Sequence, residues 1–374
     1  MAEIFLTIFF ISVLLFFLGS GIWVALSMIG VSAIGMMLFT SRPVGDAMAT
    51  TIWGTSSSWT LTALPLFVWM GEILFRTKLS ENLFRGLSPW MQKLPGGLIH
   101  VNVVGCALFA AISGSSAATV ATVGKMSIPE LRKRNYPEKI LLGSLAGSGT
   151  LGLLIPPSII LIIYGVAVQE SIAKLFIAGI IPGIMIALIF MSYVIIWSLI
   201  NKDDMPKILE EYSFLEKIKR SKQLLPVIIL ISSVIGSIYT GIATATEAAS
   251  LGVVGALILS YFQKSLNFDT FKSSLLGATK TSCMIAFILA GSTFLSLAMG
   301  FTGLPRNLAI WIQNMDLSPY VLIFVLMIFY IILGMFLDGI SAVVLTMAII
   351  EPMIRQAGFD MIWFGIFLVI VVEM

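Results

Sequence analysis

The sequence predicts an all-α, polytopic membrane protein in which some helices are broken and re-enter the membrane. Three observations predict this class. Hydrophobic residues make up 58% of the 374 residues and charged residues only 11%, whereas soluble proteins average roughly 25% charged residues. Apolar runs long enough to cross a ~30 Å hydrocarbon core recur along the chain. Between them lie segments that combine glycine, hydroxyl side chains and proline, which interrupt helices.

The apolar runs define the expected membrane spans. They exceed the roughly ten-residue alternating strands of a membrane β-barrel, so each predicts a helix. The first run lacks a positively charged leader and continues through Gly19, Ser20 and Gly21 into a second, so we expect a membrane helix and not a cleaved signal peptide. The expected spans are residues 4–18, 22–39, 59–75, 98–112, 159–168, 174–200, 224–240, 243–262, 274–300, 318–336 and 361–372.

Basic loops indicate which side of the membrane faces the cytoplasm. Loops 125–139 and 201–222 carry clustered lysines and arginines, and an even number of expected crossings separates them. A third basic loop, 264–272, falls on the same side. The formal net charge of +3 comes from such loops, so it indicates orientation in the membrane and no nucleic-acid partner.

The longest polar stretch divides the chain into two expected halves. The first half, 1–200, contains the first broken segments, and the second half, 224–374, contains a less complete set. The linker 201–223 predicts a short amphipathic helix on the cytoplasmic membrane surface, with a docking site for a partner as the alternative.

The reactive side chains argue against an enzyme. His100 is the only histidine, so zinc sites of several histidines and Ser-His-Asp triads lack their parts. An intramembrane hydrolase with Ser113 or Ser115 as nucleophile needs a base, and His100 lies at the other end of the same apolar run. Cys106 and Cys283 have no pairing motif and are interpreted as packing residues. We expect no transition-metal site and no organic cofactor.

Two broken segments of the first half have the chemistry of a sodium site. The first, "ISGSSAATVATVGKMSIPE" (112–130), is rich in hydroxyl groups, and the second, "SGTLGLLIPPS" (148–158), ends in two prolines. Pro156 and Pro157 donate no hydrogen bond, so carbonyls one turn earlier lose their helical partners. In hydrocarbon such carbonyls need protein, a cavity or a cation, and neutral oxygens suit Na⁺ at the membrane midplane. Close helix packing through small residues is the alternative.

The second half contains a weakly similar pattern. "GMFLDGISAVVLTMAIIEPMIRQAGFD" (334–360) again interrupts an apolar run with small polar residues, on the side with few positive charges. This placement suggests an inverted repeat, which is common in secondary transporters. Asp338 lies in an apolar stretch, where an ionised carboxylate is costly and a cation is its natural partner. Glu72 and Glu247 are weaker candidates, since a helix cap or an interfacial position also explains them.

Together these segments resemble one family. "SGSSAATVATVG", "GLLIPPSIILIIYG", "TATEAASLG", "GMFLDGISAVVLTMAIIEP" and "GFDMIWFGI" are similar to the large, DctM-like permease subunit of tripartite ATP-independent periplasmic (TRAP) transporters, over essentially the whole chain. The resemblance implies a Na⁺-driven importer of the bacterial inner membrane, surrounded by membrane lipid. It implies an elevator mechanism, in which a transport domain with two re-entrant hairpins slides against a scaffold.

The resemblance also implies partners and a substrate class. A periplasmic binding protein delivers an organic acid, such as a C4-dicarboxylate or sialic acid, and a small four-helix membrane subunit braces the scaffold. A self-sufficient Na⁺/dicarboxylate symporter of similar architecture, which needs no binding protein, is the alternative function.

The chemistry of the segments and the resemblance together give the candidate site residues. The candidate Na⁺ ligands are Ser113, Ser115, Ser116, Gly149, Gly152, Ile155 and Pro157 in the first half, and Asp338 and Thr346 in the second. The candidate substrate residues are Ser115, Thr119, Asp338 and Arg306.

The sequence departs from the family pattern at its end. The family's second hairpin is followed by its own Thr-Pro-Pro turn, and this chain stops at "FLVIVVEM". By analogy with the spacing between Pro137 and Pro156, the corresponding turn would fall just beyond Met374. We therefore expect a C-terminally truncated version of a longer protein, with an incomplete second hairpin.

Overall fold

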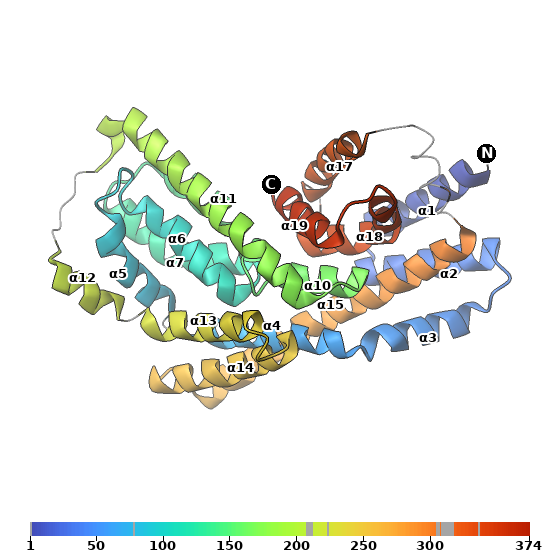
Figure 1. The fold of residues 1–374 in the computed structure, drawn as a ribbon, viewed down its shortest axis with the longest axis horizontal. Helices are drawn as coiled ribbons and strands as arrows, with labels where there is room; N and C mark the ends of the chain where they lie inside the picture. The colour runs from blue at the N-terminus through green and yellow to red at the C-terminus, as the bar shows by residue number, and fades with distance from the viewer. Residues whose placement is uncertain are drawn as a thin grey trace. The chain divides into compact units, whose positions relative to one another are not determined.

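The computed structural model describes residues 2–77, 79–206, 212–222, 224–303, 307, 318–335 and 337–374. All regular secondary structure in these ranges is helical (Figure 1), which confirms the all-α prediction. Each predicted apolar segment lies largely within a helix. The helices break where glycine, serine and proline cluster, because these residues end one helix and begin the next.

The chain folds into two compact units, and each unit combines segments that are far apart in the sequence. Unit 1 comprises Met1–Thr62, Ile162–Leu175 and Thr281–Met374, and unit 2 comprises Ala63–Leu161 and Phe176–Lys280. Three helices continue from one unit into the other: α10 (Ile159–Val168), α11 (Ile172–Ile200) and α15 (Phe268–Thr302). The division in space is therefore not a division of the sequence into halves.

Unit 1 is built around tightly packed helices near the end of the chain. Its other elements are α1 (Ala2–Gly19), α2 (Val24–Phe39), α3 (Val44–Ser56), a short 3₁₀ helix (Trp59–Thr62), α17 (Pro319–Gly334), α18 (Gly339–Gln356) and α19 (Met361–Val372). The Tyr164 hydroxyl donates to the Met361 carbonyl at 2.6 Å. A β-carbon at Gly365 would lie 2.5 Å from the Tyr164 ring, so α19 approaches α10 at a glycine.

The contact between α17 and α19 depends on Gly334. A β-carbon there would lie 2.4 Å from the Val372 carbonyl oxygen, and a backbone atom cannot rotate away. We expect Gly334→Ala to destabilise the protein by about 1–3 kcal/mol, the usual range for overpacking. Gly300→Ala is the control, because no atom lies within 4 Å of its β-carbon position. Thermal unfolding in detergent measures both, and equal melting temperatures for the two variants would contradict this packing.

Unit 2 contains the two broken segments identified in the sequence. Its elements are α4 (Ala63–Phe75), α5 (Leu79–Met91), α6 (Ile99–Ser113), α7 (Ser116–Lys133), α8 (Glu138–Gly149), α9 (Leu151–Leu154), a short 3₁₀ helix (Lys202–Asp204), α12 (Phe214–Ser221), α13 (Leu225–Tyr239) and α14 (Ala245–Phe262). Helix α12, in the polar linker, packs on α5, where the Trp90 indole donates to the Ser221 hydroxyl at 2.7 Å.

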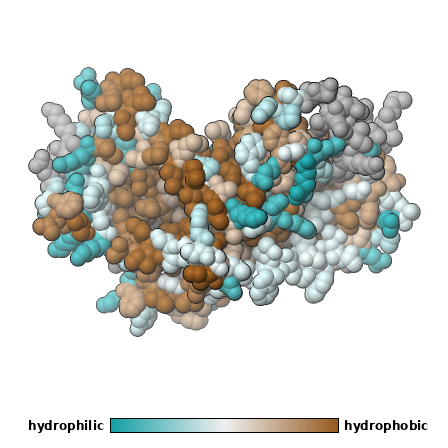
Figure 2. Space-filling model, in the orientation of Figure 1, coloured by the Kyte–Doolittle hydropathy of each residue, from teal (hydrophilic) through white to brown (hydrophobic). Residues whose placement is uncertain are grey.

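Several helices are suited to a membrane by length and composition. Within the described ranges, α11, α14, α15 and α18 are each long and apolar enough to cross it, and bent helix pairs raise the number of such spans to as many as seven. Apolar side chains gather over α11 in Figure 2, where Ile181, Leu188 and Ile196 are more than half exposed. An exposed apolar face of this kind is stable against lipid.

The two main basic loops lie at the same end of unit 2. Arg134 and Tyr136 from the first loop line one cavity together with Lys202 and Met205 from the second. This juxtaposition agrees with the even number of crossings expected between the loops.

Candidate functional site

The first helix break, between α6 and α7, is encoded by two adjacent residues. Gly114 ends α6 in the left-handed conformation, with φ of 56°, which is a common helix end for glycine. Ser115 then adopts an extended conformation as the N-cap of α7, and its hydroxyl accepts from the Ala118 amide at 3.4 Å. The half-buried serines 113, 115 and 116 are thereby concentrated at the turn.

The second helix break lies between α9 and α10. Ile155 is extended, and the Pro156–Pro157 peptide bond is cis. Pro156 occupies the position whose amide would otherwise bond to the Gly152 carbonyl. The Ser158 hydroxyl donates to the Leu153 carbonyl, so protein satisfies one of the carbonyls that the prolines release.

The two helix breaks lie so close together that the backbone of one is in contact with the backbone of the other. A β-carbon at Gly152 would lie 2.8 Å from the Ser115 carbonyl oxygen and 2.9 Å from the Ser116 amide nitrogen. A β-carbon at Gly114 would lie 3.2 Å from the Ile159 amide nitrogen. The two motifs that were separate in the sequence therefore form one site, and glycine is required where their backbones meet.

Hydroxyl groups line the α7 side of this site. The Ser113 and Thr119 hydroxyl oxygens are 2.7 Å apart, and the Ser113 oxygen lies 3.3 Å from the Ser115 carbonyl oxygen. One turn further, the buried Thr122 hydroxyl has no hydrogen-bond partner among the described residues. Thr122 was not among the candidate residues, and its burial on the same helix as Thr119 became visible only in the fold.

This arrangement offers neutral oxygen ligands. The described residues contain no group of three or more histidine, cysteine, aspartate or glutamate side chains placed to hold a metal. Serine and threonine hydroxyls with backbone carbonyls suit a monovalent hard cation, because they provide oxygen without a high negative charge. The residues at the paired breaks therefore fit Na⁺ by their chemistry.

The second-half candidates are divided between two roles. Asp338 is exposed and caps α18, where its Oδ2 accepts from the Ser341 amide at 3.2 Å. Thr346 is buried, and its hydroxyl lies 2.7 Å from the Tyr330 hydroxyl and donates to the Ala342 carbonyl at 2.7 Å. Asp338 and Thr346 are eight positions apart, about 12 Å along a helix, and each has its own local hydrogen-bond partners. Arg306 lies outside the described residues.

Unit 1 contains a polar cavity of about 490 Å³ that the sequence analysis did not identify. Its lining residues are Thr51, Gly54, Thr55, Ser58, Val166, Ala167, Gln169, Leu289, Ser292, Thr293, Ser296, Met347, Ala348 and Glu351. The Ser292 hydroxyl donates to the Val344 carbonyl at 2.5 Å and joins α15 to α18. Hydroxyl residues of α3 and α15 are far apart in the sequence, so no local pattern indicated their convergence.

Glu351, at this cavity, is held by Arg355. The Arg355 Nε donates to Glu351 Oε1 at 2.9 Å, and Nη2 donates to the Val168 carbonyl at 3.1 Å. Arg355 Nη2 also lies 3.8 Å from the Glu170 carboxylate. The guanidinium thus ties the end of α18 to the end of α10 and offsets the negative charge beside the cavity.

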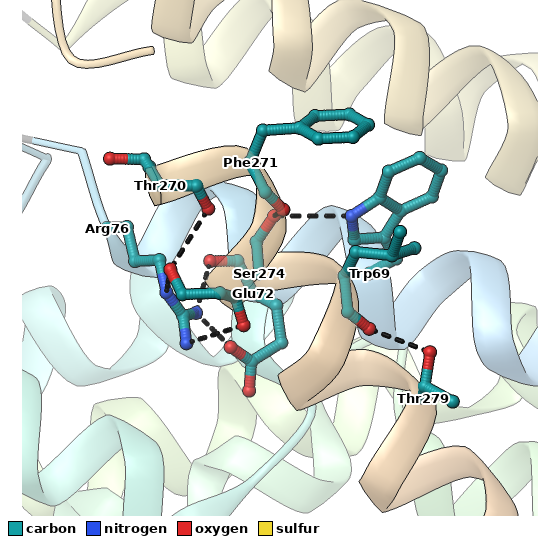
Figure 3. Close-up of polar contacts among 9 residues, drawn as sticks. Trp69, Glu72, Arg76, Thr270, Phe271, Ser274 and Thr279 are labelled. Atoms are coloured by element: carbon teal, nitrogen blue, oxygen red, sulfur yellow. Dashed lines mark hydrogen bonds and ion pairs between the residues drawn. The ribbon is translucent and has the colours of Figure 1, made fainter. Parts of the chain in front are cut away.

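Glu72 and Glu247, the weaker candidates, have local structural partners. Glu247 forms a capping box with Thr244 at the start of α14. Glu72 pairs with Arg76, which directly follows α4, and Figure 3 shows both side chains beside the first turns of α15. The Arg76 guanidinium donates to the Ser273 hydroxyl at 3.1 Å and carbonyl at 3.2 Å. A β-carbon at Gly277 would lie 2.8 Å from Glu72 Oε2, so α15 approaches the carboxylate at a glycine.

The Glu72–Arg76 pair is expected to hold α4 against α15. We expect Arg76→Gln to destabilise the protein by about 1–3 kcal/mol, because it leaves a three-quarters buried carboxylate without its hydrogen-bond partner. Adding Glu72→Gln should recover part of this loss, which unfolding in detergent measures as a coupling energy.

The exposed pair Arg132–Glu138 provides the matched control. Its side chains are 57% and 60% exposed, so Arg132→Gln should change stability by about 1 kcal/mol or less. An equal loss for Arg76→Gln and Arg132→Gln would contradict a structural role for the Glu72–Arg76 pair.

These features define a class of protein. Apolar helices that suit a membrane, paired helix breaks with neutral oxygens and a polar cavity are typical of a multi-pass transport protein. Residues 9–374 match the model of the family described as "Tripartite ATP-independent periplasmic transporter, DctM component". The chain therefore belongs to this family, as a transporter permease and not an enzyme.

Relatives with assigned names agree with the family. The chain is 32% identical to the C4-dicarboxylate TRAP transporter large permease protein DctM of Pseudomonas aeruginosa, over 91% of this chain and 79% of the relative. It is 32% identical to the ectoine/5-hydroxyectoine TRAP transporter large permease protein UehC of Ruegeria pomeroyi, over 96% and 83% respectively. It is 29% identical to the isethionate TRAP transporter permease protein DctMQ of Oleidesulfovibrio alaskensis, over 95% and 55%.

Proposed function

We propose that this protein imports a small organic acid across the bacterial inner membrane, driven by Na⁺ and dependent on a periplasmic binding protein. Membership of a tripartite, ATP-independent family supports coupling to an ion gradient. The names of the relatives support an organic solute, since they include transporters of a C4-dicarboxylate, ectoine and isethionate.

The facing helix breaks carry the proposal. Gly152 on one segment and Ser115 on the other meet at backbone distance, which brings the hydroxyls of the first turn to the prolines of the second. A cation held between the two turns would stabilise them in contact. Coupling follows when the ion binds one conformation of the empty carrier better than another, so that solute and ion each favour the other's binding.

We also propose roles for the candidate residues of the second half and for the partner proteins. Asp338 and Thr346 are proposed to contribute to a second ion and substrate region, and Ser115, Thr119 and Arg306 to solute binding. The polar cavity of unit 1 provides a further surface for the solute. A small four-helix membrane subunit is proposed as a partner, since one relative carries a joint DctMQ name. The carrier is proposed to move as an elevator built from inverted repeats.

Reconstitution distinguishes this function from a self-sufficient symporter. Proteoliposomes with the permease and small subunit should take up a radiolabelled C4-dicarboxylate only with an inward Na⁺ gradient and added binding protein. An equal inward K⁺ gradient is the control. Uptake of equal rate without the binding protein would favour the self-sufficient symporter, and uptake under K⁺ alone would contradict Na⁺ coupling.

A further inference from the structure

A cavity of about 300 Å³ lies at the basic end of unit 2, away from the paired helix breaks. Three segments meet there: the turn between α5 and α6, the turn after α7, and the end of α11 with the residues that follow it. The lining residues are Gln92, Lys93, Leu94, Pro95, Gly96, Gly97, Leu98, Arg134, Tyr136, Ser198, Leu199, Lys202, Met205 and Pro206. Three of these side chains are cationic and none is anionic.

The positive charge at this cavity is only partly compensated. Arg134 Nε donates to Glu130 Oε1 at 2.8 Å, so a carboxylate already offsets this cation. Lys93 and Lys202 form no ion pair within the part of the chain that the structure describes. Like charges around one cavity repel each other, and a bound anion relieves that repulsion.

The walls of the cavity also provide a neutral donor. The Tyr136 hydroxyl accepts from the Leu98 amide at 3.0 Å, which leaves its own proton for another acceptor. Burial raises the pKa of Tyr136, although the Leu98 amide and the Arg134 charge oppose this, so the phenol keeps its proton at neutral pH. Gly97 has φ of 54°, and its β-carbon position is 2.5 Å from the Tyr136 oxygen, so glycine is needed for this close turn.

An apolar helix face begins at the mouth of the cavity. Leu199 lines the cavity and is 48% exposed, and on the preceding turn of α11 Ile196 is 58% exposed. Tyr193 continues this exposed face, and Figure 2 shows the apolar side chains gathered over α11. A molecule with an anionic group in the cavity therefore has an apolar surface beside it for acyl chains.

We propose that this cavity binds the phosphate group of an anionic phospholipid, with the acyl chains lying along α11. Lys93, Lys202 and Arg134 would hold the phosphate, and the Tyr136 hydroxyl would donate to one of its oxygens. The basic loops that form the cavity are those predicted to face the cytoplasm, where the leaflet carries anionic lipid and basic pockets between helices bind headgroups. Inorganic phosphate has the same anionic oxygens as a phospholipid headgroup but no acyl chains. Comparing the two in the test therefore distinguishes lipid binding from phosphate binding.

Native mass spectrometry of the purified, delipidated full chain tests the proposal. The probes are dioleoylphosphatidylglycerol, zwitterionic dioleoylphosphatidylcholine and inorganic phosphate. We expect phosphatidylglycerol to bind more tightly than phosphatidylcholine. Lys93→Gln with Lys202→Gln should weaken phosphatidylglycerol binding about 25-fold, at about fivefold for each lysine near the headgroup.

Two further double variants control for net charge and folding. Lys264→Gln with Lys272→Gln removes the same charge from exposed positions of the third basic loop and should bind like the unmodified protein. Lys93→Arg with Lys202→Arg should retain binding. Equal weakening in both glutamine double variants, or equal affinity for the two lipids, would overturn the proposal. Lysine-dependent binding of inorganic phosphate as tight as that of phosphatidylglycerol would overturn the assignment to lipid.

Discussion

Gly152→Ala is expected to raise the Na⁺ concentration needed for half-maximal uptake by about five- to 150-fold. The added methyl group would lie 2.8 Å from the Ser115 carbonyl oxygen and 2.9 Å from the Ser116 amide nitrogen. Both are backbone atoms, so neither can rotate away. Overpacking of this kind typically costs about 1–3 kcal/mol. This cost destabilises the conformation in which the two helix breaks are in contact. That range converts to the stated change in affinity, at tenfold for each 1.4 kcal/mol. Na⁺-dependent uptake into proteoliposomes that contain the complete transporter measures it.

Gly143→Ala is the matched control for this prediction. Gly143 lies on α8, the helix that precedes α9 and Gly152, is exposed, and has no atom within 4 Å of its β-carbon position. Alanine favours a helix over glycine by about 1 kcal/mol, so this variant should be at least as stable as the unmodified protein and should transport normally. Unchanged Na⁺ dependence in Gly152→Ala would show that the contact between the breaks is not part of the ion site.

Asp338→Asn is expected to abolish Na⁺-dependent uptake while leaving the protein folded. Asparagine caps a helix about as well as aspartate, so the bond from the Ser341 amide should survive the substitution. Only the negative charge is lost, and a cation site in the membrane depends on that charge. Combining Asp338→Ala with Ser115→Ala removes a side chain from each proposed region and should abolish uptake as well.

Asp360 separates capping from ion binding. It is also an exposed N-cap in unit 1, where its Oδ1 accepts from the Trp363 amide at 2.9 Å. Asp360→Asn should therefore retain both stability and uptake. Normal Na⁺-dependent uptake by Asp338→Asn would leave helix capping as the sole role of Asp338 and remove it from the proposed ion region.

The helix breaks were predictable because local residues encode them. Gly114 and Ser115 end one helix and begin another by their own backbone preferences, and Pro156 removes a hydrogen-bond donor wherever it stands. Apolar runs likewise predicted membrane helices, because burial in lipid requires little beyond length and composition. Local chemistry therefore indicated that the two motifs belong to one site before their contact was visible.

Features that depend on long-range contacts were not predictable in this way. Asp338 was expected as a candidate cation ligand, and its position as an exposed N-cap of α18 became visible only in the fold. The cavity of unit 1 collects hydroxyls such as Thr51 and Ser292 from distant helices, each of which alone resembles an ordinary span residue. Glu72 was a weaker candidate that a helix cap or an interfacial position also explained, and the bond from its partner Arg76 to the distant Ser273 became visible only in the fold.

The central claim is that the paired breaks of α6–α7 and α9–α10 bind Na⁺. Thermal unfolding of the purified protein in NaCl, compared with KCl of equal concentration, tests it most directly because no transport partner is needed. An ion that binds only the folded state stabilises it by about 1.4 kcal/mol at ten times its dissociation constant. The structure predicts a higher melting temperature in NaCl for the unmodified protein and a smaller difference for Gly152→Ala. Equal melting temperatures in NaCl and KCl, up to a NaCl concentration that saturates uptake, would contradict the claim.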